Sequence, residues 1–244
     1  MALFVVGTPI GNLKDITERA KEIIMKSQIF ICEQREYAMK LLNYLGAKPK
    51  KILTISKEEN LPETVLEELK NTDGVLVVSA GTPAISDPGS RIVKICAEKG
   101  VNVVPIPGVS AVTTALSVCG FDTSRFIFLG FIPKKGRKNF LMKIKRGMEL
   151  LPFSPILVIY ESPHRVISTL QDIADVFGEQ SQVFLAREMT KMFEEFIRGK
   201  ITDVMEELIR RKEQKGSIKG EITIVVSFRD ADSFDQPKPQ VENQ

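Results

Sequence analysis

Three loops of small residues follow apolar segments in the first half of the chain, at Gly7–Asn12, Ser79–Gly89 and Pro107–Ala111. Glycine allows the backbone to come close to a ligand, and proline fixes the shape of a loop so that little entropy is lost on binding. We therefore expect these loops to hold a small molecule through backbone groups and small side chains. The candidate binding residues are Pro9, Gly11, Gly81, Thr82, Pro83, Ser86, Ser110 and Ala111.

Each loop follows a short apolar segment rich in β-branched residues, which is typical of a strand buried in a parallel sheet. These segments are Leu3–Val6, Val75–Val78 and Val101–Ile106. For a single loop, an ordinary connection between a strand and a helix is the simpler interpretation. The carboxyl ends of parallel strands share one edge of a sheet, however, so we expect the three loops to converge on one cleft.

Strands and amphipathic helices alternate through the first half of the chain. Further strands are predicted at Ile29–Cys32 and Ile52–Ile55, and the first helix is predicted to begin at a capping box formed by Asp15 and Glu18. Alternation of this kind implies right-handed crossovers and a parallel sheet with helices on both faces.

The pattern changes near Phe121, and the elements that follow predict a mixed α/β domain. Helices are expected at His164–Phe177 and from a cap at Thr202 to about Lys215. The predicted strands are Pro155–Glu161, Val183–Arg187, Glu194–Ile201 and Glu221–Phe228, and the middle two are expected to be antiparallel neighbours.

The sequence thus predicts an α/β protein of two domains, with a parallel sheet in the first, a mixed sheet in the second and a cleft between them. We expect the domains to span residues 1–121 and 122–229. The tail, residues 230–244, has no apolar period and is expected to be disordered.

The composition is that of an ordinary soluble globular protein, with 43% hydrophobic and 27% charged residues. No apolar run reaches a membrane-spanning length, so we expect a cytoplasmic protein with no membrane partner. Cys32, Cys96 and Cys119 lie in apolar surroundings and are expected to be buried thiols. One histidine and no metal-ligand spacing of cysteines predict no metal site.

The segment Lys134–Arg146 carries seven basic residues and no acidic one. A solvated helix normally mixes charges of both signs, so this bias favours binding to an anionic partner such as an RNA backbone. An exposed basic helix without a ligand is the alternative. The candidate RNA-binding residues are Lys134, Lys135, Arg137, Lys138, Lys143, Lys145 and Arg146.

Five motifs together resemble the tetrapyrrole-methylase superfamily, and within it the bacterial 16S rRNA (cytidine-2′-O)-methyltransferase branch. They are Thr8–Leu13, Gly81–Gly89, Pro107–Ala111, Tyr160–Arg165 and Ala186–Lys191. The resemblance implies a class III methyltransferase of two α/β domains, which is a homodimer and holds folded S-adenosylmethionine in its cleft. It also implies a ribose 2′-oxygen of 16S rRNA, in naked rRNA or the 30S subunit, as the site of methylation.

Methyl transfer from a sulfonium is an in-line displacement that depends mainly on alignment. A ribose hydroxyl is a weak nucleophile, so a carboxylate, or a cation that stabilises the developing alkoxide, would assist it. The candidate catalytic residues are Glu33, Asp87, Glu161, Arg187, Glu188 and Lys191. Alternatives remain for some: Asp87 could cap the next helix, Arg187 and Glu188 could pair with each other, and His164 could act as a base or bond the backbone.

The chain departs from the branch at two positions. The branch usually has Glu-Asp-Thr-Arg where this chain has Glu33–Glu36, and Ser-Asp-Ala-Gly-Thr-Pro where this chain has Val78–Pro83. Gln34 and Ser79 thus replace acidic residues near the expected site. Besides rRNA methylation, two functions remain open: methylation of a small molecule such as a tetrapyrrole, and RNA binding without catalysis.

Overall fold

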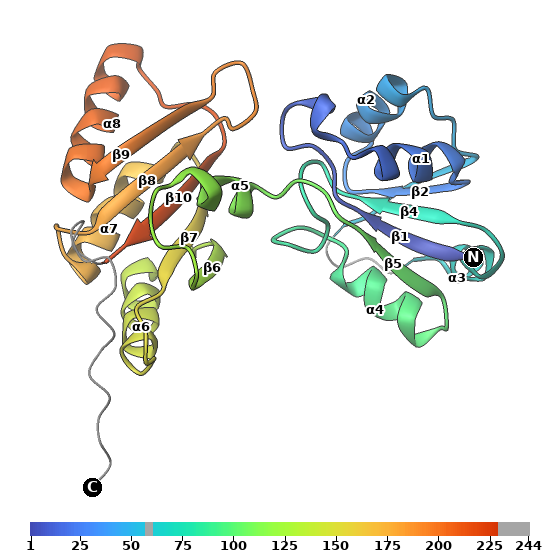
Figure 1. The fold of residues 1–244 in the computed structure, drawn as a ribbon, viewed down its shortest axis with the longest axis horizontal. Coiled ribbons are helices and arrows are strands. Elements are labelled where there is room, and N and C mark those ends of the chain that lie inside the picture. The colour runs from blue at the N-terminus through green and yellow to red at the C-terminus, as the bar shows by residue number, and fades with distance from the viewer. Residues whose placement is uncertain (57–60, 229–244) are drawn as a thin grey trace, which may run out of the picture. The chain divides into compact units, whose positions relative to one another are not determined.

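The chain divides into two compact units, Met1–Ala111 and Val112–Gln244 (Figure 1). The computed structural model describes residues 1–56 and 61–228. The division falls after Ala111, whereas the sequence placed it after Phe121, so helix α5 (Ala111–Val118) lies almost wholly in the second unit. The tail expected to be disordered lies outside the described residues.

The first unit contains a parallel sheet with strand order β3-β2-β4-β1-β5, as predicted. Its strands are β1 (Ala2–Val6), β2 (Ile29–Cys32), β3 (Lys51–Thr54), β4 (Gly74–Val77) and β5 (Asn102–Ile106). Its helices are the 3-10 turn η1 (Leu13–Asp15), α1 (Glu18–Lys26), α2 (Arg35–Leu45), α3 (Glu63–Asn71) and α4 (Ser90–Glu98).

Helices cover both faces of this sheet, because successive side chains of a strand point to opposite faces. In β2, Ile29 and Ile31 belong to a buried cluster that includes residues of α3 and α4. Phe30 and Cys32 belong to a second cluster, with residues of α1 and α2. The expected three-layer arrangement is therefore confirmed for this unit (Figure 1).

The capping box expected at the first helix is wrong. The cap of α1 is Thr17, whose hydroxyl accepts a hydrogen bond from the Ala20 N–H at 3.2 Å. Asp15 instead ends η1, where its N–H donates to the Asn12 carbonyl at 2.9 Å. The 3-10 turn η1 thus includes Asp15, which the sequence pattern had assigned to the start of the helix.

The second unit contains a mixed sheet with strand order β6-β7-β10-β8-β9. Strands β6 (Phe126–Phe131) and β7 (Ile156–Glu161) are parallel, and β10 (Ile222–Ser227) is antiparallel to both of its neighbours. Strands β8 (Gln182–Arg187) and β9 (Glu195–Lys200) form the antiparallel pair that was predicted. Its further helices are α6 (Arg137–Glu149), α7 (Val166–Phe177) and α8 (Ile201–Lys215). Thr202 does not cap α8, because the helix begins one residue earlier, after Lys200.

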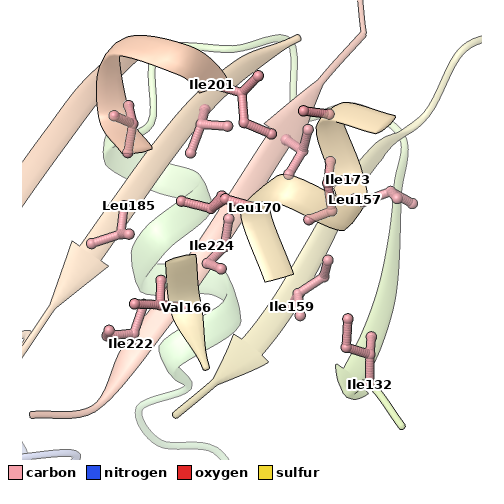
Figure 2. Packing of buried hydrophobic residues seen from close by; sticks show 14 of the residues in the cluster. Ile132, Leu157, Ile159, Val166, Leu170, Ile173, Leu185, Ile201, Ile222 and Ile224 are labelled. Atoms are coloured by element: carbon pink, nitrogen blue, oxygen red, sulfur yellow. The ribbon is translucent and has the colours of Figure 1, made fainter. Parts of the chain in front are cut away.

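The core of this unit lies between one sheet face and helices α6, α7 and α8. Figure 2 shows Leu157 and Ile224 of the sheet beside Leu170 and Ile173 of α7. The opposite face carries other buried residues, among them Val158, Phe184 and Val225. Near that face, the Arg198 guanidinium donates to the Val118 carbonyl at the end of α5, at 2.6 Å.

Among the described residues, no helix has the length and apolar character needed to cross a membrane.

We expect Leu170→Ala to lower the free energy of unfolding of the second unit by about 2–5 kcal/mol, because Leu170 is fully buried. Urea denaturation followed by circular dichroism measures this change. Gln171→Ala, at the exposed neighbouring position of α7, is the matched control. Equal loss of stability in both variants would contradict the assignment of this core.

Candidate active site

The first two loops are joined by backbone hydrogen bonds at the carboxyl edge of the parallel sheet. The Thr8 N–H donates to the Gly81 carbonyl at 2.8 Å, and the Gly81 N–H donates to the Thr8 carbonyl at 3.1 Å. The loops after β1 and β4 therefore form a short antiparallel bridge. This contact follows from the strand order, since β1 and β4 are neighbours.

The third loop joins the same assembly. The Thr82 hydroxyl donates to the Val109 carbonyl at 3.2 Å, which ties the second loop to the third. Gly7 and Gly108 bring the first and third loops together so closely that a Cβ on Gly7 would lie 2.9 Å from the Gly108 Cα. The three loops thus converge, and glycine is required where the first meets the third.

The loop after β4 holds an unusual backbone shape. Ala84 and Ser86 have φ values of 70° and 65°, which residues with a side chain rarely adopt and which cost about 1–3 kcal/mol each. Gly81 has φ of 81°, so a β-branched residue there would be strained even though a Cβ would meet no atom closer than 3.6 Å. The Ala84 N–H donates to the Pro88 carbonyl at 3.1 Å and closes the turn. The loop after β4 therefore has a defined turn closed by a backbone hydrogen bond.

A carboxylate joins the loops from the neighbouring strand β2. Glu33 is half-buried, and its Oε2 accepts a hydrogen bond from the Ser79 hydroxyl at 2.8 Å and from the Ser79 N–H at 3.3 Å. The other departure from the family branch, Gln34, lies elsewhere: it is the exposed N-cap residue of α2. Only one of the two replaced acidic positions therefore contacts this carboxylate.

The binding residues expected from the sequence all lie on the three loops of the first unit. Pro9, Gly81 and Pro83 are buried, and Gly11 is exposed. The half-buried members of the set are Thr82, Ser86, Ser110 and Ala111. Asp87 is half-buried in the same loop, but it does not cap the next helix, since the N-cap of α4 is Gly89.

The remaining catalytic candidates lie in the second unit. Glu161 is fully buried and accepts hydrogen bonds from the Thr169 hydroxyl and the Ser162 N–H, both at 2.6 Å. It also pairs with the Arg165 guanidinium at 2.6 Å. A buried carboxylate with these partners is compensated for the loss of water, and here it holds the turn between β7 and α7. His164 lies exposed in that turn.

Glu188, Lys191 and Glu221 form an ion-pair network. The Lys191 ammonium lies 3.0 Å from Glu188 and 2.9 Å from Glu221, and the Glu221 N–H donates to Glu188 at 2.8 Å. Burial raises the pKa of Glu188, but the Glu221 amide and Lys191 together outweigh it and leave that pKa below its ordinary value. Burial lowers the pKa of Lys191, yet its two carboxylate partners leave it raised.

One alternative from the sequence was that Arg187 and Glu188 pair with each other. The structure gives Arg187 other partners. The Arg187 guanidinium donates to Glu195 at 2.9 Å and to the Lys219 carbonyl at 3.1 Å. Arg187, Glu188 and Lys191 therefore lie together at the end of β8, each with an acidic or backbone partner.

The basic segment forms helix α6, and part of it faces α7. Arg137 pairs with Asp172, Lys138 lies 2.5 Å from Asp175, and the Lys145 ammonium donates to the Val176 carbonyl at 2.8 Å. The basic residues left exposed, with no ion pair to another described residue, are Lys134, Lys135, Lys143 and Arg146. About half of the expected RNA-binding set is thus used to pack one helix against another.

The candidates named from the sequence did not include some residues that build the site. Thr8, Gly7 and Gly108 hold the loops together, and Ser79 holds Glu33. Thr8 and Gly7 directly follow β1, and that position could have indicated them. The contact between Ser79 and Glu33 depends on β2 and β4 being neighbours, and no local pattern in the sequence reveals this.

Known proteins are similar to this chain over nearly its whole length. The family model for tetrapyrrole (corrin/porphyrin) methylases matches residues 2–205. Ribosomal RNA small subunit methyltransferase I of Thermotoga maritima is 39% identical over 231 residues, which cover 93% of this chain and 99% of that protein. The protein of the same name from Haemophilus influenzae is 38% identical, and 98% of this chain and 83% of that relative are covered.

Solved structures show the same fold. The crystal structure of the methyltransferase CobJ has a TM-score of 0.64, with 15% identity and 92% of this chain and 93% of that chain covered. At this identity the likeness concerns the fold alone.

We expect Glu188→Gln to lower stability at neutral pH and to reduce its dependence on pH. The pKa of Glu188 is lowered by folding from 4.5, so its contribution is present above that pH and is lost as the pH falls through the folded value. Urea midpoints measured from pH 7 to pH 3 should therefore converge for wild type and variant at the acid end. Glu179→Gln, at an exposed position, is the control; a constant difference at every pH would contradict the ion-pair network.

Proposed function

Because the chain belongs to the tetrapyrrole (corrin/porphyrin) methylase family, we propose that it transfers a methyl group from S-adenosylmethionine to a cytidine 2′-oxygen of 16S rRNA. The observation that carries this proposal is similarity over nearly the full chain to relatives named for methylation of small-subunit ribosomal RNA. The acceptor is naked 16S rRNA or the 30S subunit. A cytoplasmic homodimer completes the proposal, on the strength of the family resemblance.

The loops of the first unit suit this methyl donor. S-adenosylmethionine supplies an electrophilic methyl group on a positively charged sulfur. The converging loops offer small side chains and backbone groups, which would hold adenosine and the methionine portion. Within the described residues, Glu33 Oε2 accepts both bonds from Ser79, which leaves Oε1 to face a cation or a proton donor. One half-buried carboxylate beside a cationic ligand is favourable electrostatically.

Alignment is the main task of these residues, and it can supply about 7–11 kcal/mol of the barrier. The preformed turn after β4 would hold the donor in one orientation with little loss of entropy. Glu33 or Asp87 would accept the proton of the ribose hydroxyl. Arg187 and Lys191 would stabilise negative charge on the acceptor. Glu161 and Glu188 would act by holding Arg165 and Lys191 in place.

The exposed basic residues on α6 and just before it would contact RNA phosphates. Lys134, Lys135, Lys143 and Arg146 give a local excess of positive charge that the net charge of +3 does not reveal. Clustered lysine and arginine residues of this kind supply the salt-dependent part of RNA affinity. Arg137, Lys138 and Lys145 would contribute less, since they already bond α7.

One assay separates the possible functions. The protein is incubated with methyl-labelled S-adenosylmethionine and, separately, with 30S subunits, naked 16S rRNA or a small-molecule extract. We expect label in rRNA, and nuclease digestion should locate it on the 2′-oxygen of cytidine. Label in small molecules alone would favour a tetrapyrrole-type substrate. RNA binding without transfer to any acceptor would favour a protein that has lost the reaction.

We expect Ser79→Ala to lower kcat/KM by roughly tenfold to a hundredfold, because a hydrogen bond to a charged group contributes about 1.5–3 kcal/mol. The variant keeps the backbone N–H but loses the 2.8 Å bond from the hydroxyl to Glu33. Initial rates of methyl transfer and calorimetry with S-adenosylmethionine measure the effect. Ser90→Ala, at the exposed start of α4, is the matched control. If both variants match wild type, Glu33 is not held in place by Ser79 for this reaction.

A further inference from the structure

The turn between β8 and β9 exposes two large apolar side chains. Met192 is 90% exposed and Phe193 is 69% exposed, at the end of the hairpin formed by the two strands. Neither residue belongs to a core cluster of the second unit. Exposed apolar groups next to each other on a turn indicate a contact with another molecule.

The backbone of the turn is held by several contacts although its apolar side chains are exposed. Glu188 and Thr190 have φ values of 53° and 65°, and the Lys191 N–H donates to the Glu188 carbonyl at 3.0 Å. The Glu194 carboxylate accepts a hydrogen bond from the Thr190 N–H at 2.6 Å. Gly220 makes room for this arrangement, because a Cβ there would lie 2.4 Å from the Glu188 Cγ. Backbone strain maintained by so many contacts is typical of residues that bind a ligand.

The strand that follows the turn carries one aromatic and two basic side chains on its outward face. Phe196, Arg198 and Lys200 are exposed there. The Arg198 guanidinium lies 5.8 Å from the centre of the Phe196 ring and 4.6 Å from that of the buried Phe184, and it donates to the Val118 carbonyl at 2.6 Å. Lys200 is a cation of this face with no ion pair to another described residue. Glu195, on the other face of the strand, is bonded to Arg187 and Arg211. Aromatic rings beside cations form the surface on which proteins bind unpaired nucleotides.

We propose that Phe193 stacks on an unpaired base of the RNA substrate, and that Lys200, farther along β9, contacts a phosphate of the same RNA. The inference rests on the proposed function, since it assigns a further contact to the same RNA. The size of the apolar surface favours a base over a second protein. Met192 and Phe193 expose the area of two side chains, whereas a stable protein interface buries about 800 Å² on each partner. One exposed aromatic side chain beside an exposed methionine matches the face of one stacked base.

The test uses the absence of tryptophan from this chain. Phe193→Trp makes the only tryptophan, at the position proposed to contact a base. We expect its fluorescence to be quenched when naked 16S rRNA or a short single-stranded oligocytidylate is added to the full-length variant. Met25→Trp, at a 59% exposed position on α1 of the first unit, is the control and should change little. Equal responses from both variants would overturn the proposal.

Affinity measurements separate stacking from phosphate binding. We expect Phe193→Ala to weaken binding to the oligocytidylate about tenfold, and Phe193→Tyr to retain most of the affinity. The dependence on salt should be unchanged in Phe193→Ala but reduced in Lys143→Ala, since only the lysine contacts phosphate. Unchanged affinity in Phe193→Ala would overturn the proposal. Sedimentation of Phe193→Ala tests whether a second copy of the chain covers the turn instead. If an oligomer of the wild type dissociates in this variant, the proposal is also overturned.

Failure of the proposed methyl transfer and failure of the stacking contact give different results. If no acceptor is methylated but Phe193→Trp is still quenched by RNA, the stacking contact stands and the reaction does not. If rRNA is methylated normally by Phe193→Ala at low RNA concentration, the reaction stands and the stacking contact does not.

Discussion

The candidate site depends on the position of β1 between β4 and β5 in the parallel sheet. That order makes the three loops neighbours, and paired backbone hydrogen bonds between Thr8 and Gly81 fix the first to the second. The first and third loops meet through Gly7 and Gly108, where no side chain fits. The site is therefore built from backbone, and its shape depends more on strand order and glycine than on any charged residue.

The charged residues of the two units differ in their capacity to act on a substrate, because some already have several hydrogen-bonding partners and others have few. Glu161 has three hydrogen-bonding partners and no exposure, so its role is to stabilise a turn and orient Arg165. Glu33 is half-buried, and Ser79 engages only one of its oxygens. A carboxylate can respond to a substrate only if it keeps some capacity to accept a proton or a cation. By this criterion Glu33 is better suited to chemistry than Glu161.

Much of the fold could be predicted from the sequence, because it follows from local periodicity. Buried strands such as Phe30 to Cys32 and the helices between them produce regular apolar patterns, and the family motifs identified the loops correctly. Helix starts were less certain: Asp15 and Thr202 were both assigned as caps, but Thr17 and Lys200 precede the helices. Neighbouring residues compete for a cap, and a small difference in turn geometry decides between them.

The partners of charged side chains could not be predicted, since they depend on which elements lie together. Arg187 bonds Glu195 across a strand pair, and Arg137 bonds Asp172 on the next helix. The same limit applies to the exposed turn at Phe193, because the sequence does not show which apolar residues pack into the core. Only the three-dimensional arrangement shows that its aromatic side chain has no place in the core.

The two departures from the family branch have different physical consequences. Gln34 stands at the exposed N-cap of α2 and makes no capping bond with its side chain, where aspartate would be a good cap. That replacement concerns the start of a helix. Ser79 contacts Glu33 directly, and an aspartate there would place a second negative charge beside the first. The hydroxyl instead donates a hydrogen bond, so Ser79 orients Glu33 and adds no second negative charge beside it.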